Sequence, residues 1–312
     1  MKDYRDLRIV FMGTPEFAVA SLAALLDAGC TVVGVITAPD KPAGRGMKLT
    51  ESPVKKYAAA HGLKILQPVK LKDADFLAQL RSLNADLQVV VAFRMLPEAV
   101  WNMPPMGTIN LHGSLLPDYR GAAPINWAII NGEKETGVTT FKLKHEIDTG
   151  NILLRESFPI GEDDTAGDVH DKMKIIGANL LVETIKGLAA GTIVEKPQES
   201  RDGHEPEAPK ILSETCRIDW SRPVEDVYNF IRGLSPNPGA FTVINEKMLK
   251  VFRAKKEITH MDVPEGEPET DGKTYLKFSC SNGYLHLLDV QLEGKKRMPV
   301  GDFLRGYKFD GE

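Results

Sequence analysis

Apolar residues in the first part of the chain follow strand-like and helix-like patterns in alternation. Residues 7–13 form an apolar run that ends in glycine, and residues 31–37 form a second apolar run of strand length. Between them, residues 15–29 begin with proline and end with glycine, as helices commonly do. A strand, a helix and a second strand in this order predict a right-handed parallel unit, with which an α/β doubly wound sheet begins.

The alternation of strand-like and helix-like patterns continues to about residue 190. The run at residues 87–92 is apolar on both faces, which is typical of a parallel strand covered on both sides. Gly177 is a candidate break in a long amphipathic helix. We therefore predict a Rossmann-like, doubly wound and mostly parallel sheet in a first domain of residues 1–192. Further helices are predicted at residues 54–62, 73–83 and 165–191, and further strands at residues 87–92, 137–143 and 150–160.

The pattern changes after residue 192. Residues 193–210 are polar, contain three prolines and lack apolar periodicity, so we predict a linker. In residues 211–312, one helix at 224–234 is followed by short strands with turn residues between them. This arrangement favours a smaller, OB-like β-barrel, with an acidic loop at residues 257–271. The strands are predicted at residues 239–244, 247–256, 273–280 and 283–294.

Composition narrows the class of protein without identifying it. The formal net charge of −4 and the isoelectric point near 6.0 exclude a wholly basic nucleic-acid binder but leave room for a local basic patch. Cys30, Cys216 and Cys280 are far apart and form no CxxC pair, which is typical of reduced thiols and predicts neither a disulfide nor a metal site. We see no signal-peptide pattern and no apolar run near the ~20 residues of a membrane span. We expect a cytoplasmic, non-membrane protein that acts as a monomer.

The turn after the first predicted strand is a weak candidate for dinucleotide binding. It contributes one glycine, Gly13, where the dinucleotide fingerprint needs several. The amino end of the following helix could receive an anion or a polar substrate group, but a plain strand-to-helix turn explains the same residues equally well. We therefore do not expect a nicotinamide cofactor.

Residues 107–112 carry the clearest candidate chemistry. In an extended segment, alternation places Asn110 and His112 on one face, at a strand end where open α/β sheets bind their ligands. Asp148 follows in a loop between two predicted strands and could return to the same edge. An amide can donate to an oxyanion, an imidazole can move a proton, and a carboxylate can orient the imidazole. From the residues alone, a structural histidine at a strand end is the alternative.

A longer block around these residues matches a known family. The core of the folate-dependent formyltransferases closely resembles the block NLHGSLLPDYRGAAPINWAIINGEKETGVTTFKLKHEIDTGNIL. The resemblance extends over nearly the whole chain, through IVFMGTPEFA, APDKPAGRGMKL, VVVAFRMLP, DTAGDVHDKM, RIDWSRPVEDVYNFIRGLSPNPGAFT and LEGKKRMPVGDFLRG. The chain departs from the family where Phe93 and Arg94 replace a more usual Tyr-Gly pair, and where KLKHEIDTG lacks a Met and a glycine–leucine pair before the aspartate.

The resemblance implies an activity and the residues that carry it. Members of this family transfer a formyl group directly from 10-formyltetrahydrofolate to an amine, and their catalytic Asn, His and Asp match Asn110, His112 and Asp148. No metal is implied. The family's folate-binding positions match Phe93, Arg94, Met95, Leu96, Ser114, Leu115, Leu116 and Pro117.

The resemblance also implies that the acceptor is the α-amine of the methionyl-tRNA used in translation initiation. A basic, glycine-rich loop with Lys41, Arg45 and Lys48 is then expected to contact the acceptor arm, although a solvated loop explains its composition as well. Two alternatives stay open: a sugar-amine formyltransferase, and a 10-formyltetrahydrofolate hydrolase in which water replaces the amine. Candidate phosphate contacts in the second domain are Lys250, Arg253, Lys255, Lys256, Lys295, Lys296 and Arg297.

Overall fold

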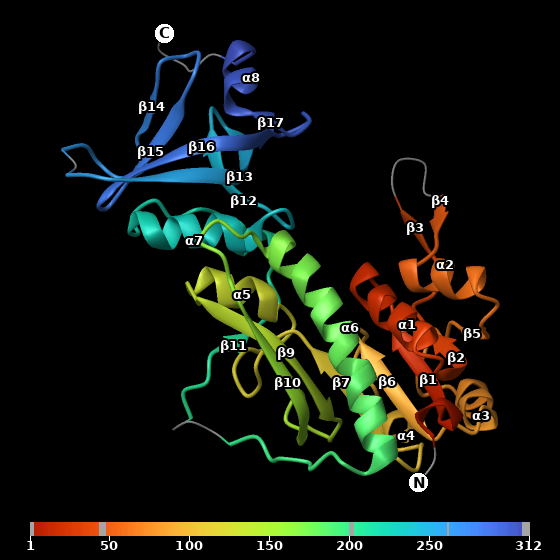
Figure 1. Cartoon of the computed structure of the whole chain (residues 1–312). Coiled ribbons are helices and arrows are strands. Elements are labelled where there is room, and N and C mark those ends of the chain that lie inside the picture. Colours follow the sequence, from red (N-terminus) through yellow and green to blue (C-terminus); the bar gives the residue numbers. More distant parts are fainter. Residues whose placement is uncertain (1–2, 44–47, 200–202, 261, 308–312) are drawn as a thin grey trace. The chain divides into compact units, whose positions relative to one another are not determined.

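The computed structural model describes the chain except for residues 1–2, 44–47, 200–202, 261 and 308–312. The chain forms two compact units, whose elements are labelled in Figure 1. Segments 121–136 and 159–169, which lie early in the chain, belong with its C-terminal part. The first unit consists of residues 1–120, 137–158 and 170–206, and the second unit consists of residues 121–136, 159–169 and 207–312.

A seven-stranded sheet with the order β10-β9-β7-β6-β1-β2-β5 forms the centre of the first unit. Strands β5, β2, β1, β6 and β7 pair in parallel, whereas β9 is antiparallel to β7. Strand order reverses at β1, which pairs with β2 on one side and with β6 on the other. The predicted doubly wound, mostly parallel fold is therefore confirmed. The strands are β1 (Arg8–Gly13), β2 (Thr31–Ile36), β5 (Ile65–Leu66), β6 (Leu87–Val91), β7 (Thr108–His112), β9 (Glu135–Lys142) and β10 (Ile152–Pro159).

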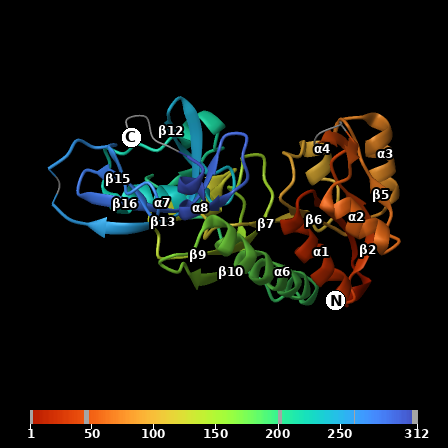
Figure 2. The ribbon, with the colours of Figure 1, turned by 90° about the horizontal axis from the view of Figure 1, so that it is seen from above.

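Alternation along β1 explains why helices cover both faces of the sheet. Val10 and Met12 of β1 are fully buried in a cluster that includes Phe76 and Leu80 of α3. Ile9, which alternates to the other face, is also fully buried. Figure 2 shows α3 and α4 on one side of these strands and α1 and α6 on the other. The helices are α1 (Glu16–Asp27), α2 (Pro53–Ala60), α3 (Ala74–Ser82), α4 (Glu98–Trp101) and α6 (Ala166–Ala190).

Helix α6 runs without interruption through Gly177, so the predicted break there is wrong. A Cβ atom added to Gly177 would lie 2.9 Å from Cδ2 of Leu111 and 3.4 Å from Cγ1 of Val138. The missing side chain therefore lets the helix approach β7 and β9 closely. Glycine serves close packing at this position, and the helix tolerates it.

Several short elements were not predicted from the sequence. Strands β3 and β4 form a two-stranded antiparallel hairpin inside the basic segment, and β8 pairs with β11. These elements are β3 (Lys41–Ala43), β4 (Lys48–Thr50), β8 (Arg120–Gly121), β11 (Glu207–Ala208), α5 (Pro124–Ile130) and the 3₁₀ helices at Tyr4–Asp6 and Ser213–Cys216.

The second unit contains a six-stranded antiparallel half-barrel, which confirms the smaller β-rich fold predicted after the linker. The order is β12-β13-β16-β15-β14, with β17 on β16. The prediction of a loop over all of 257–271 is wrong, because β13 remains paired with β16 as far as Ile258 and residues 268–270 form β14. The elements are α7 (Val224–Leu234), β12 (Ala240–Ile244), β13 (Lys247–Ile258), β14 (Pro268–Thr270), β15 (Leu276–Cys280), β16 (Gly283–Leu292), β17 (Met298–Pro299) and α8 (Val300–Arg305).

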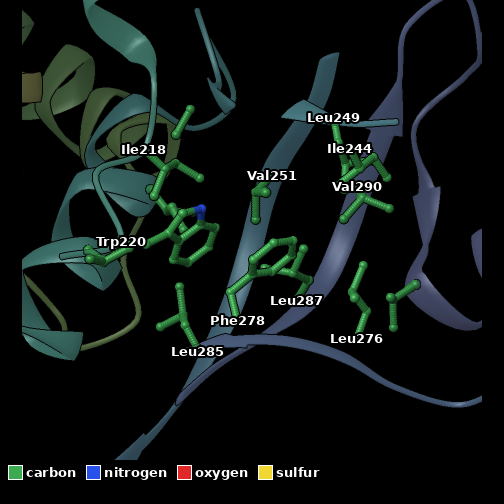
Figure 3. Packing of buried hydrophobic residues seen from close by; sticks show 14 of the residues in the cluster. Ile218, Trp220, Ile244, Leu249, Val251, Leu276, Phe278, Leu285, Leu287 and Val290 are labelled. Atoms are coloured by element: carbon green, nitrogen blue, oxygen red, sulfur yellow. The ribbon is translucent and has the colours of Figure 1, made fainter. Parts of the chain in front are cut away.

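Two stacked aromatic rings lie in the core of the second unit (Figure 3). The Trp220 and Phe278 rings are nearly parallel, with centroids 4.5 Å apart and an angle of 7° between planes. The Trp220 indole also donates to the Thr242 hydroxyl at 3.1 Å, so the ring is held at its polar end as well. Both rings are surrounded by buried aliphatic side chains of the strands and of α7.

Phe278→Ala will destabilise the second unit by about 3–5 kcal/mol, because it removes a 3% exposed ring and leaves a cavity beside Trp220. Denaturant unfolding of the whole chain, followed by circular dichroism, measures this loss. The matched control is Val243→Ala on β12, where the side chain is 45% exposed and the expected change is below about 0.5 kcal/mol. Equal effects of the two substitutions would contradict the packing described here.

Candidate active site

His112 is the last residue of β7, at the carboxyl edge of the parallel strands. The residue is 6% exposed. Its Nε2 atom lies 2.9 Å from the carbonyl oxygen of Tyr119, and its ring meets the Phe141 ring edge-on with 6.5 Å between centroids. Contacts from two sides therefore hold the imidazole in one orientation.

The contact with Tyr119 determines which nitrogen of His112 carries the proton. A carbonyl oxygen only accepts hydrogen bonds, so Nε2 must be the donor, and the lone pair of the neutral ring is then on Nδ1. Nδ1 lies 3.8 Å from Oδ2 of Asp148, which is an ion-pair distance and longer than a hydrogen bond. The two side chains are 7% and 13% exposed, so the pair is largely shielded from solvent.

Asp148 reaches His112 on a loop that connects β9 to β10. Lys142, the last residue of β9, pairs with Ile109 rather than with the end of β7, so the loop leaves the sheet away from His112 and then returns to it. Asp148 has a φ of +54°, in the left-handed region that costs a residue with a side chain on the order of 1 kcal/mol or more. A residue in this conformation needs surrounding contacts to hold it.

Asn110 lies two residues before His112 on β7 and is half-buried. Alternation places its side chain on the same face of the strand as the imidazole. Within the part of the chain that the structure describes, the Asn110 amide makes no hydrogen bond. The structure thus brings His112 and Asp148 together and leaves a neighbouring amide available to a ligand.

Hydrogen bonds and buried side chains hold the turn after β7 in place. The Ser114 hydroxyl donates to the carbonyl of Asp118 at 2.6 Å, and the Thr139 hydroxyl donates to the carbonyl of Ser114 at 2.7 Å. Leu116 is fully buried against Phe141, and Pro117 is buried as well. Of the four candidate folate contacts Ser114 to Pro117, Leu115 alone is partly exposed and the other three are buried.

Residues 93–96 follow β6 and form the other candidate folate segment. Since Val91 of β6 pairs with Leu111, this segment begins beside the end of β7. Arg94 donates to the carbonyls of Pro68 and Val69, while Met95 is 73% exposed. Phe93 and Leu96 are partly buried and pack against a buried apolar cluster of the unit.

The basic segment expected to contact RNA is in part a hairpin. Lys41 begins β3 and Lys48 begins β4, whereas Arg45 lies outside the described residues. Asp40 at the base accepts from Lys55 at 2.5 Å and from Gln67 at 2.8 Å. The hydrogen bond from Lys55 is the main cause that lowers the pKa of Asp40 below its ordinary value, so this anchor stays ionised at neutral pH.

The candidate phosphate contacts of the second unit fall into two groups. Lys256 pairs with Glu225 at 2.8 Å, Arg297 donates to Asp289 at 2.7 Å, and Lys250 donates to the Pro238 carbonyl at 2.8 Å, so these three are engaged within the unit. The other four are exposed and, among the described residues, have no ion-pair partner, so they are better placed to meet phosphates: Arg253, Lys255, Lys295 and Lys296.

Two functionally placed residues were not predicted from the sequence. Tyr119 acts through its backbone carbonyl, which no side-chain pattern reveals. Gln198 lies in the predicted linker, and its amide donates to the carbonyls of Asp148 and Gly150 at 2.7 and 2.9 Å. The quoted block contains Tyr119, but its letters alone do not indicate a role for the carbonyl.

The described ranges contain neither a group of metal-ligating side chains nor a membrane-spanning helix. Three or more His, Cys, Asp or Glu residues are nowhere grouped there as ligands for a metal ion. None of the helices described there has both the length and the apolar character needed to cross a membrane.

Family comparisons define the class of the protein. A formyl transferase domain matches residues 7–185, and a formyl transferase C-terminal domain matches residues 210–308. The chain therefore belongs to the formyl transferase family. Among its relatives, the methionyl-tRNA formyltransferase of Parabacteroides distasonis is 55% identical over 312 residues, covering 97% of this chain and 96% of the relative. The methionyl-tRNA formyltransferase of Bacteroides fragilis is 53% identical over 309 residues, covering 97% and 95%.

Solved structures share the fold at much lower identity. An N-formyltransferase from Helicobacter canadensis, in complex with folinic acid and dTDP-3-aminofucose, has a TM-score of 0.67 and 20% identity, covering 94% of this chain and all of that one. HypX from Aquifex aeolicus, in complex with tetrahydrofolic acid, has a TM-score of 0.66 and 19% identity, covering 97% and 48%. At this identity the likeness establishes the fold alone.

Proposed function

We propose that this chain transfers the formyl group of 10-formyltetrahydrofolate to the α-amine of methionyl-tRNA, producing N-formylmethionyl-tRNA for translation initiation. One observation carries the proposal: relatives that are 53% to 55% identical over 97% of the chain, through both family domains, are methionyl-tRNA formyltransferases. The likeness to the N-formyltransferase in complex with dTDP-3-aminofucose is more distant, at 20% identity.

In this proposal, the three segments predicted from the sequence have separate roles. Residues 1–192 carry catalysis, residues 193–210 connect, and residues 211–312 dock the tRNA. All the residues proposed for the reaction come from one chain, so a monomer is sufficient. The substrates place the reaction in the cytoplasm.

Asn110 acts on the charge that develops during the reaction. The amine nitrogen bonds to the formyl carbon, and the bond from that carbon to the folate nitrogen breaks. Attack places negative charge on the formyl oxygen, and the unengaged Asn110 amide donates a hydrogen bond to it. A donor of this kind typically contributes about 10²–10³ in rate, because the charge appears only as the transition state forms.

His112 and Asp148 move the protons. The neutral imidazole offers its lone pair at Nδ1, because Nε2 is occupied by the Tyr119 carbonyl. Nδ1 takes the proton that the amine loses on attack, and the carboxylate of Asp148, 3.8 Å away, stabilises the imidazolium. The same proton then passes to the departing folate nitrogen, so His112 and Asp148 return to their starting protonation states.

The substrates occupy different parts of the surface in this proposal. The folate ring lies along residues 93–96 and the turn at 114–117, where Phe93, Leu96 and Leu115 are partly exposed apolar residues. The acceptor arm contacts the hairpin that includes Lys41 and Lys48, and the exposed cations of the second unit contact phosphates farther along the tRNA.

The test offers labelled 10-formyltetrahydrofolate with methionyl-tRNA, uncharged tRNA, free methionine or a sugar nucleotide that bears an amine. We expect formyl transfer only to methionyl-tRNA, with a KM that rises at least about tenfold between roughly 50 and 200 mM salt, because phosphate contacts release counterions. Release of formate without an amide product would support a hydrolase, and transfer to the sugar amine with little salt dependence would support a sugar N-formyltransferase.

A further inference from the structure

Gln198 lies in the predicted linker, yet all its amide groups are engaged beside the catalytic loop. Its Nε2 donates to the carbonyl of Asp148 at 2.7 Å and to the carbonyl of Gly150 at 2.9 Å. Its Oε1 accepts from Nε and Nη2 of Arg120 at 3.0 and 2.6 Å. A primary amide has two N–H donors and two lone pairs, and here all four are used.

The two carbonyls that accept from Gln198 lie at the strained part of the catalytic loop. They belong to Asp148, whose backbone is left-handed, and to Gly150, two residues later on the same loop. A hydrogen-bond clamp across both carbonyls fixes the orientation of the peptides around Asp148. The carboxylate that faces His112 is attached to this fixed backbone, so Gln198 acts on it without touching the reacting atoms.

The segment that carries Gln198 is itself attached along the catalytic loop. Lys196 exchanges two backbone hydrogen bonds with Ile152, at 2.7 and 2.9 Å. Glu195 accepts from Lys142 at 2.9 Å and from Asn151 at 3.1 Å. The hydrogen bond from Lys142 is the main cause that lowers the pKa of Glu195, which keeps this anchor ionised at neutral pH. Gln198 is thus held against the loop by the residues before it.

Tyr119 and Arg120 connect the two members of the catalytic pair. The carbonyl of Tyr119 accepts from Nε2 of His112, and the next residue, Arg120, orients the Gln198 amide that clamps Asp148. One dipeptide therefore supports both His112 and Asp148. The placements of the imidazole and of the carboxylate therefore both depend on contacts with this dipeptide.

We propose that Gln198 is a positioning residue for formyl transfer, which sets the placement of the Asp148 carboxylate through the loop backbone, with Arg120 as its support. This proposal rests on the proposed function for its kinetic test. Gln198→Ala will lower kcat about 10- to 100-fold and leave the KM for methionyl-tRNA within about threefold, because misplacing a catalytic group affects the chemical step more than binding.

A double-mutant cycle separates positioning from a general structural role. In an Asp148→Asn background, Gln198→Ala will lower kcat less than about threefold, because the carboxylate that Gln198 positions is already absent. Full, independent losses in both backgrounds would overturn the proposal. The matched control is Glu199→Ala, an exposed neighbour in the same segment, for which we expect normal kcat.

Hydrogen exchange tests the clamp without any substrate. Amides of residues 143–151 will exchange at least about tenfold faster in Gln198→Ala than in Glu199→Ala, while the strands of the second unit exchange alike in both. Unchanged exchange in this loop would overturn the clamp, whatever the activity of the chain. If the unaltered chain transfers no formyl group to methionyl-tRNA, the proposed function fails, and the exchange result still decides the role of Gln198.

Discussion

Asp148→Asn will lower kcat for formyl transfer to methionyl-tRNA by about 10²–10⁴-fold, with little change in KM. The substitution keeps the shape of the side chain but removes the negative charge that lies 3.8 Å from Nδ1 of His112. Without this charge, the imidazolium that forms when the amine loses its proton is no longer stabilised in a largely shielded site. Steady-state kinetics at saturating folate donor measure the effect.

Glu146→Gln provides the matched control, since it makes the same change of charge in the same loop. The Glu146 side chain is exposed, and the residue contacts Thr149 through its backbone carbonyl. We expect its kcat to stay within about twofold of the unaltered chain. The assignment of Asp148 to proton transfer would be abandoned if Asp148→Asn kept a third or more of the original kcat, or if both substitutions were equally harmful.

The fold could be predicted from the sequence because its central strands are buried on both faces. Every residue of β6 is buried, and four of its five residues are apolar as a consequence. The same alternation placed Asn110 and His112 on one face, because the side-chain period of a strand does not depend on what surrounds it. Helical boundaries were marked by proline and glycine, as at the two ends of α1.

Two supports of the candidate site and one packing contact could not be predicted, each for its own physical reason. Tyr119 acts through a carbonyl group, which every residue has, so its letter carries no signal. Gln198 is 50 residues from Asp148 in the chain, and its polar surroundings are typical of a linker. Gly177 suggested a helix break, because nothing local indicates that Leu111 packs against it.

The sequence also could not show which of the candidate tRNA-binding cations are paired with carboxylates. A count of lysines and arginines treats all cations alike, yet Lys256 and Arg297 are paired with Glu225 and Asp289. Glu225 lies on α7, whereas Lys256 lies on β13, so their proximity depends on tertiary packing. Composition therefore favoured a basic surface but did not show which of its cations are paired with carboxylates.

Gly150→Ala will lower kcat by about 10²-fold or more in a chain whose second unit remains folded. A Cβ atom at this position would lie 1.6 Å from the carbonyl oxygen of Lys142 and 3.1 Å from Cδ2 of Phe141, so the loop backbone must move. Asp148 is two residues away on that loop, and a displacement of about 1 Å is enough to cost about 10²-fold in rate. Steady-state kinetics measure the loss, and denaturant unfolding followed by circular dichroism checks that the second unit remains folded. The matched control is Gly301→Ala in α8, where the atom nearest to the new Cβ is 3.8 Å away. For this control we expect an unchanged kcat and an equal or slightly higher free energy of unfolding. Near-normal turnover of Gly150→Ala would show that the path of the loop past Lys142 does not determine the placement of Asp148.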